Sequence, residues 1–180
     1  TDDFMKMLKD NSINVIKIRY SASPKDRIVE SRNALREVVL EQDYDYFLSL
    51  EQDVIPPLNI IKKLITHKKD AVTGIYFNYF PGLDKPVPLA FIDSQKKWFA
   101  MRTLSGDELS SNKLIRIMAS GLGCILISRN VLKAIKFRYN KRLDTFDDMS
   151  FCEDLENNQF ELYVDTSIKC KHLLKNRPWS

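Results

Sequence analysis

The sequence predicts an α/β fold with a mixed central sheet flanked by helices. An apolar run over 46–50 is followed by two acidic residues and then by Pro56 and Pro57, which is the order strand, loop, helix. A second apolar run over 122–127 leads through Ser128 into another helical pattern, and short β-type runs lie between the two units. Strands that alternate with helices favour a sheet with helices on its faces.

Length and composition favour one domain over the whole chain, 1–180. With 180 residues and 44% hydrophobic content, the chain can bury one sizeable core. Its net charge of +4 comes from mixed acidic and basic side chains, so the excess suits an anionic ligand but falls short of a nucleic-acid-binding composition. The three cysteines are widely spaced and fit reduced, buried thiols better than a disulfide framework.

No apolar stretch approaches the roughly 18 residues that a membrane-spanning helix needs. We therefore expect no transmembrane segment and a cytoplasmic location, with peripheral attachment to a membrane as the alternative. The chain begins at Thr1 without a methionine or a signal-peptide pattern, which we interpret as a fragment of a longer chain.

Periodicity predicts the elements at the start of the chain. Residues 1–9 carry apolar side chains at helical spacing, and 14–20 alternates as a short strand does. Ser23 and Pro24 have the pattern of an N-cap and a first-turn proline. We expect a helix of about four turns to begin there.

The rest of the chain divides by the same patterns. We expect strands over 43–50, 71–77, 122–127 and 162–168, with short β-type runs over 87–92, 97–104 and 114–119. We expect a helix after Ser128 and another over about 150–158, where Ser150 and Glu153 have capping-box spacing. A further helix is expected from Pro56 and Pro57, with the apolar stripe Leu58, Ile61, Leu64 and Ile65.

Glu51 and Asp53 are the main candidates for metal ligands. They lie two residues apart after the strand 43–50, and side chains two apart on a strand point to the same side. Such a pair at the carboxyl end of a buried strand suits a hard divalent cation that carries a phosphorylated substrate. Acidic residues at a strand end also commonly face water or cap the next helix, so the pair needs support from elsewhere in the chain.

Arginines on the preceding helix give the first support. Arg27, Arg32 and Arg36 lie on this helix beside Asn33, and an arginine fork pairs bidentately with phosphate. A solvated helix face is the alternative, and it fits Arg36 better than Arg32.

The acidic pair Asp147 and Asp148 is the candidate for a general base. A loop before a helix N-terminus can present a carboxylate into a cleft, close to a reacting hydroxyl. The nearby Glu153 fits a capping-box partner better than a catalyst, which leaves Asp148 as the stronger candidate. The helix dipole also favours acidic residues at this place for stability alone.

His172 and two glycines complete the candidates. A neutral imidazole can complete a coordination shell begun by carboxylates, and it moves the preference from Mg²⁺ towards Mn²⁺. Zinc held by Cys170 and His172 is a weaker alternative, because the chain has no Cys-x-x-Cys pair. Gly121 and Gly123 flank the start of a strand, where they permit close approach of a ligand to the backbone or mark a bulge.

Taken in order, these segments resemble the family 2 type nucleotide-sugar glycosyltransferases. The resemblance extends from about Arg27 to His172 and lies in the order and spacing of short motifs. The motifs are Ser31-Arg32-Asn33, the run Asp45 to Pro57 with its Glu51-Gln52-Asp53, the run Gly121 to Ile127, Asp147-Asp148, and Tyr163-Val164-Asp165 through to His172.

The resemblance implies a Rossmann-like nucleotide-diphospho-sugar transferase fold and the family's chemistry. A sugar would move from a nucleotide-diphosphate donor to a hydroxyl of a glycan, lipid or protein acceptor, with inversion. Glu51 and Asp53 match the motif that binds the donor diphosphate through Mn²⁺ or Mg²⁺, and His172 matches a further metal ligand. Asp148, with Asp147 beside it, matches the motif that supplies the catalytic base. The donor-binding residues expected from the set are Arg27, Arg32, Asn33, Gly121 and Gly123.

Two departures from the family pattern leave other functions open. The family opens with a strand whose following loop helps to bind the nucleotide base, and nothing before Thr1 supplies it. Glu51 also stands where the family has an aspartate. One alternative is a nucleotidyltransferase, although the glycine-rich phosphate loop usual in that class is not evident. The other is a non-catalytic nucleotide- or carbohydrate-binding module on the same fold.

Overall fold

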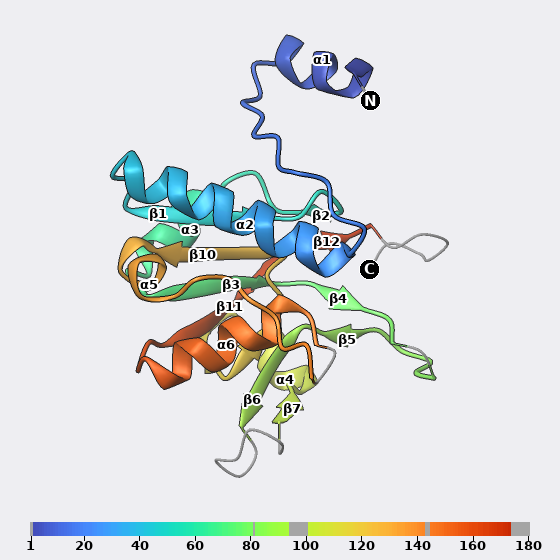
Figure 1. Cartoon of the computed structure of the whole chain (residues 1–180). Coiled ribbons are helices and arrows are strands. Elements are labelled where there is room, and N and C mark those ends of the chain that lie inside the picture. The colour runs from blue at the N-terminus through green and yellow to red at the C-terminus, as the bar shows by residue number, and fades with distance from the viewer. Residues whose placement is uncertain (1, 81, 94–100, 143–144, 174–180) are drawn as a thin grey trace.

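A five-stranded mixed sheet lies at the centre of the molecule, as the computed structural model of residues 2–80, 82–93, 101–142 and 145–173 shows (Figure 1). The α/β fold and the mixed sheet predicted from the sequence are confirmed. The strand order is β1-β10-β3-β11-β8. Their bounds are Tyr46–Leu50 for β1, Cys124–Ser128 for β10, Ala71–Ile75 for β3, Leu162–Lys169 for β11 and Leu114–Ile117 for β8.

Strand direction brings several chain ends to one edge of the sheet. β10 is antiparallel to both β1 and β3, and β11 is parallel to β3, so β1, β3 and β11 run the same way. Their carboxyl ends therefore meet at one edge, where the amino end of β10 also lies. Ligand sites of open α/β sheets lie at such an edge.

Helices cover the two faces of the sheet unequally. One face packs against α2, α5 and α6, and the other against the short α3 (Figure 1). The first face carries the larger apolar cluster, in which Ile125 and Ile127 of β10 lie among residues of all three helices. The helix bounds are Asp2–Asp10 for α1, Pro24–Glu41 for α2, Ile60–Thr66 for α3, Gly106–Ser110 for α4, Arg129–Ala134 for α5 and Asp147–Asn157 for α6.

Three small sheets surround the central one. The antiparallel pairing of β12 with β2 sets His172 opposite Val54, which brings the end of the described chain beside the loop after β1. The small sheets are β12 (Lys171–His172) with β2 (Val54–Ile55), β4 (Phe77–Asn78) with β5 (Val87–Pro88), and β7 (Met101–Thr103) with β6 (Ala90–Asp93) and β9 (Ala119–Ser120).

Local sequence signals fix the start of α2 and its attachment to the fold. The Ser23 side chain accepts a hydrogen bond from the Asp26 N–H, as predicted for this N-cap. The Arg36 guanidinium donates to the carbonyls of Leu132 and Ile135, at 2.7 and 2.9 Å. Arg36 therefore joins α2 to the end of α5, and its interpretation as part of a solvated face is wrong.

The strand predicted over 14–20 is wrong. This segment has no regular secondary structure and pairs with none of the described strands. Ile16 and Tyr20 are exposed. The preceding α1 has no buried residue, and it stands apart from the central sheet (Figure 1). Alternation indicates β propensity, but a strand also needs a neighbour for its backbone groups.

The helix predicted from Pro56 begins only at Ile60. Of its expected apolar stripe, Leu64 is buried, whereas Leu58, Ile61 and Ile65 are exposed. Ile60 and Leu64, which are four residues apart and so lie on one face of the helix, pack in the apolar cluster on this side of the sheet instead.

The capping box predicted at Ser150 is also wrong. α6 begins at Asp147, its N-cap is Phe146, and Ser150 lies buried within the helix. The predicted strand over 162–168 and the helix after Ser128 are confirmed. Of the run predicted over 97–104, residues 97–100 lie outside the described residues and Met101–Thr103 forms β7.

Two other predictions have direct answers. Cys124, Cys152 and Cys170 are free and buried, as expected. Within the described ranges, no helix is long and apolar enough to cross a membrane.

Gly74 occupies a position in β3 that has no room for a side chain. A Cβ there would lie 2.7 Å from Cγ2 of Ile168 and 3.1 Å from Sγ of Cys170. We expect Gly74→Ala to lower the free energy of unfolding by about 1–3 kcal/mol, because an overpacked core must shift; denaturant titration measures the loss. Gly106→Ala is the matched control, since a Cβ there meets no atom within 4 Å. Equal stabilities of the two variants would contradict this packing.

Candidate functional site

A cavity lies at the edge where the carboxyl ends of the strands meet. Glu51, directly after β1, Tyr76, directly after β3, and His172, in the short β12 that follows β11, all line it. Its volume is about 240 Å³. Its lining consists of Ile28, Arg32, Glu51, Tyr76, Asn78, Leu89, Gly121, Leu122, Phe146, Asp147, Asp148 and His172.

Glu51 and Asp53 lie in a turn rather than on a strand. The Val54 N–H donates to the Glu51 carbonyl at 3.1 Å, which closes the turn between β1 and β2. The argument that a strand points both carboxylates to one side is therefore wrong. Glu51 turns towards Arg32, whereas Asp53 Oδ2 lies 3.5 Å from Nε2 of His172.

Arg32 is the charged centre of the cavity. Arg32 is 8% exposed, and its guanidinium binds the Asp147 carboxylate through one nitrogen and the Glu51 carboxylate through another. Asp147 is buried like Arg32, but the Glu51 side chain is 44% exposed. A buried cation needs such partners because desolvation of an unpaired charge costs several kcal/mol. The bridge fixes α2, the loop after β1 and the start of α6 relative to one another.

Asp148 differs from its neighbour Asp147 because it has no ion-pair partner among the described residues. One of its oxygens accepts the Met149 N–H at 2.7 Å. Burial raises the pKa of Asp148; the charges of Asp147 and Glu51 raise it further, while the Met149 N–H and Arg32 oppose the rise. A carboxylate with a raised pKa at the edge of a cavity is suited to accept a proton.

His172 is held in one orientation. Its Nδ1 lies 2.7 Å from the Phe77 carbonyl, so Nδ1 carries the proton and donates. In the neutral ring this leaves the lone pair of Nε2 directed to the side of Asp53. The Tyr76 ring packs edge-on against the imidazole, with centroids 5.5 Å apart.

The predicted metal ligands do not converge as a set of three. Within the described residues, no group of three or more His, Cys, Asp or Glu side chains is arranged to hold a metal ion. Asp53 and His172 nevertheless bring a carboxylate oxygen and an imidazole nitrogen to within 3.5 Å of each other. Ions that carry phosphates commonly use one or two protein ligands and take the others from water and substrate. Asp53 and His172 therefore fit such an ion, and Glu51 as placed serves Arg32.

The two glycines make room for a protein side chain. A Cβ on Gly121 would lie 2.2 Å from the Tyr76 hydroxyl oxygen, and one on Gly123 would lie 2.8 Å from it. The Gly123 N–H donates to this hydroxyl at 2.7 Å. Burial raises the pKa of Tyr76, which keeps the phenol protonated. The glycines were predicted to let a ligand approach the backbone closely, but it is the Tyr76 side chain that does so. Gly121 also lines the cavity.

Two predicted donor-binding residues lie away from the cavity lining. Asn33 donates to the Phe137 carbonyl and accepts the Phe137 N–H, at 2.9 and 3.0 Å. Arg27 donates to the carbonyls of Ser21 and Ala22 and holds the chain before α2. Both side chains are occupied with backbone groups.

The sequence interpretation missed Tyr76, Asn78 and Phe146, all of which line the cavity. Tyr76 lies directly after the strand 71–75, at the same edge of the sheet as Glu51. Its position at a strand end is therefore the sequence signal that could have identified it as a cavity residue. Phe146 precedes the acidic pair, but a single aromatic residue has no pattern that distinguishes it from a core residue.

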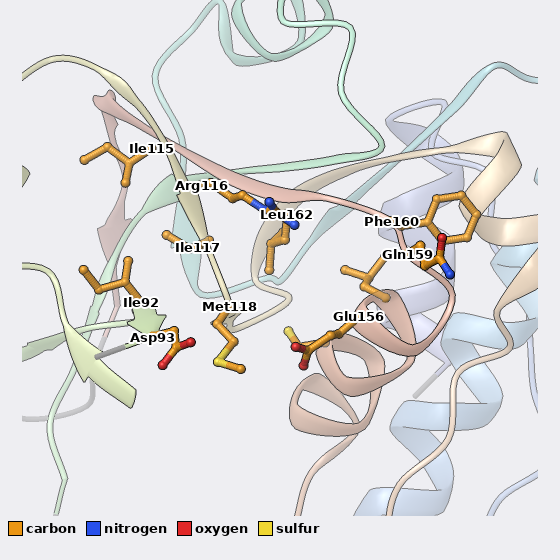
Figure 2. A pocket seen from close by; sticks show the side chains of 12 residues that line it. Ile92, Asp93, Ile115, Arg116, Ile117, Met118, Glu156, Gln159, Phe160 and Leu162 are labelled. Carbon is orange, nitrogen blue, oxygen red and sulfur yellow. The ribbon is translucent and has the colours of Figure 1, made fainter. Parts of the chain in front are cut away.

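A second and larger cavity lies beside the second half of α6 (Figure 2). Its volume is about 610 Å³, and its walls come from β6, β8 and the second half of α6. Ile92, Ile117 and Leu162 provide apolar surface, with Arg116 and Glu156 among the lining residues. None of the residues predicted to act in catalysis lines it.

Comparison with known proteins gives a structural relative but no information on the chemistry. No family model matches the chain, and no curated protein matches it. A197 from STIV, known from a crystal structure, is similar with a TM-score of 0.56 and 19% sequence identity. The likeness covers 97% of this chain and 80% of that chain. At this identity it shows a shared fold alone.

The Arg32 bridge yields a stability test. Arg32→Met keeps a long apolar stem but leaves Asp147 buried without its cation, so we expect a loss of about 3–5 kcal/mol in the free energy of unfolding. Denaturant titration near neutral pH measures it. Glu51→Gln removes the exposed partner and should cost at most about 1 kcal/mol. If Arg32→Met cost no more than Glu51→Gln, the bridge would not be the central contact.

Proposed function

We propose that this protein is a metal-dependent glycosyltransferase that moves a sugar from a nucleotide-diphosphate donor to an acceptor hydroxyl with inversion. The observation that carries the proposal is the placement of Asp148, a carboxylate with a raised pKa, in one cavity with Arg32 and His172. We further propose that the five-stranded sheet belongs to the Rossmann-like nucleotide-diphospho-sugar transferase fold. The site at the carboxyl ends of the strands supports this assignment.

The donor diphosphate is assigned to the His172 end of the cavity, where Asp53, which lies outside the lining, approaches Nε2 of His172 to 3.5 Å. A divalent cation, Mn²⁺ or Mg²⁺, bound there would offset the negative charge that develops on the departing diphosphate. His172 is oriented for this by its hydrogen bond to the Phe77 carbonyl, and Asp53 is half exposed and accessible from solution. Such second contacts fix a ligating imidazole in place.

Asp148 is assigned as the general base. The acceptor oxygen forms a bond to the anomeric carbon as the bond from that carbon to the diphosphate oxygen breaks. The acceptor proton passes to Asp148, and the diphosphate leaves with the electron pair. One displacement with no covalent intermediate inverts the anomeric centre. Asp147 lies beside the base, but its carboxylate is engaged with Arg32, so its role is to position the start of α6.

The roles of the other candidate residues follow from the same assignment. Arg32 and Gly121 line the cavity and stay proposed as donor contacts, Arg32 in addition to its bonds with Asp147 and Glu51. Arg27 and Asn33 do not line it, and their side chains bind backbone groups. The three buried free thiols support a reducing compartment such as the cytoplasm.

Replacement of the base is the direct test. In the presence of Mn²⁺ and a panel of nucleotide sugars, we expect Asp148→Asn to reduce transfer by about 10²- to 10⁴-fold, because the amide cannot accept the proton. Diphosphate release and product analysis measure the rate. Glu153→Gln is the matched control on the same helix, since Glu153 is part-exposed and lies near Arg138 rather than in the cavity.

The pH dependence has a defined sign. Transfer needs the ionised form of Asp148, so the rate should fall as the pH falls through the pKa of this group. Since burial raises that pKa, the acidic limb should lie above the ordinary aspartate value of about 3.9. The fall in rate at low pH should remain in Glu153→Gln and should be absent from the residual activity of Asp148→Asn. This result would identify Asp148 as the group that titrates.

The same assays separate the two alternative functions. If neither the unaltered protein nor Asp148→Asn turns over any donor but both bind nucleotide, a non-catalytic binding module is favoured. Nucleotidyl transfer to a sugar phosphate would favour the nucleotidyltransferase.

A further inference from the structure

An aromatic side chain is exposed at the cavity beside the assigned base. Phe146 is 52% exposed, although it lines the cavity and immediately precedes Asp147 and Asp148. A large apolar side chain at such a place leaves apolar surface in contact with water.

The position does not favour phenylalanine for structural reasons. Phe146 is the N-cap of α6, and no side-chain hydrogen bond caps the helix there. Ser, Thr, Asp and Asn are preferred at N-caps because their side chains accept an N–H of the first turn. Ser23, Ser105 and Ser128 do this for three other helices of this chain. Residues that break a local rule without a structural gain tend to mark functional positions.

The cavity lining contains both polar and apolar side chains. Arg32, Glu51 and Asp148 supply charged groups, and Asn78 adds an amide. Apolar surface comes from Ile28, Leu89, Leu122 and Phe146. Pockets for drug-sized ligands measure roughly 300–1,000 Å³, so a cavity of about 240 Å³ suits a group the size of one ring.

A sugar ring has matching surfaces. Its hydroxyl groups hydrogen-bond with charged and amide groups, while its axial C–H bonds present a weakly positive apolar face. The face of an aromatic ring carries the negative part of its quadrupole and attracts such C–H groups. Lys25 Nζ lies 5.0 Å from the centroid of the Phe146 ring, which is within the range of a cation–π contact.

We propose that Phe146 is the platform on which the sugar ring of a carbohydrate acceptor stacks, with the reacting hydroxyl directed to Asp148. The proposal rests on the proposed function and names the acceptor class as a saccharide. The adjacent positions of Phe146 and Asp148 in the chain join recognition of the acceptor to deprotonation of its hydroxyl. The acceptor ring therefore fills the part of the cavity beside α6, and the donor diphosphate lies at the His172 end, towards Asp53, which is outside the lining.

The test compares Phe146→Ser with Phe146→Trp. Serine at this N-cap can accept a hydrogen bond from the first turn of α6, so the melting temperature should stay the same or rise. We expect Phe146→Ser to raise the KM for methyl glycoside acceptors at least tenfold more than it raises the KM for the donor, because a stacking contact to the acceptor is lost. Phe146→Trp should retain acceptor binding. Tyr44→Ala, which removes an exposed aromatic outside the cavity, is the matched control.

Binding measured without catalysis separates this proposal from the proposed function. Saturation-transfer NMR with methyl glycosides should show contact of the ring C–H protons with the unaltered protein and Phe146→Trp, and loss of it in Phe146→Ser. Those results with no donor turnover would sustain the platform and overturn the transferase. A shift confined to the donor KM, a lowered melting temperature in Phe146→Ser, or glycoside binding that survives this change would overturn the platform.

Discussion

The buried guanidinium of Arg32 is the contact on which the arrangement of the site depends. It joins residues that are 19 and 115 positions away in the chain, Glu51 after β1 and Asp147 at the start of α6. A cation in this place is stable only with its carboxylates, and the carboxylates in turn need the cation. The position of α6, and with it the position of Asp148, therefore follows from an electrostatic requirement as well as from apolar packing.

This bridge also sets two neighbouring aspartates apart. Asp147 lies against Arg32, and its negative charge is compensated. Asp148 is desolvated, and its pKa is raised by burial and by the charges of Asp147 and Glu51. Pairs of carboxylates in unlike environments commonly divide their roles in this way. Tyr76 completes the support from the opposite side, because its hydroxyl holds the Gly123 N–H and its ring packs against His172.

Sequence periodicity was sufficient for the parts of the fold that depend on local signals. The apolar runs at 46–50 and 162–168 became strands, and Ser23 and Ser128 capped helices, because each pattern carries its own physical cause. The segment 14–20 failed because a strand also requires a partner. Phe146 rather than Ser150 is the N-cap of α6, and no local rule favours an aromatic N-cap. Some of the residues that line the cavity could be identified from the sequence, but the contacts between them could not. The turn at 51–54 and the bridge from Arg32 to Glu51 arise from tertiary packing, which a strand-based argument cannot anticipate.

The central claim is that Asp53 and His172 hold the ion that carries a diphosphate at the carboxyl edge of the sheet. Crystals soaked with Mn²⁺ and a nucleoside diphosphate test it directly through anomalous diffraction. The account predicts an anomalous peak between Asp53 Oδ2 and His172 Nε2, at about 2.0–2.2 Å from each, with diphosphate oxygens completing the shell. A bound nucleoside diphosphate with its ion elsewhere, or with no ion between these two side chains, would contradict it.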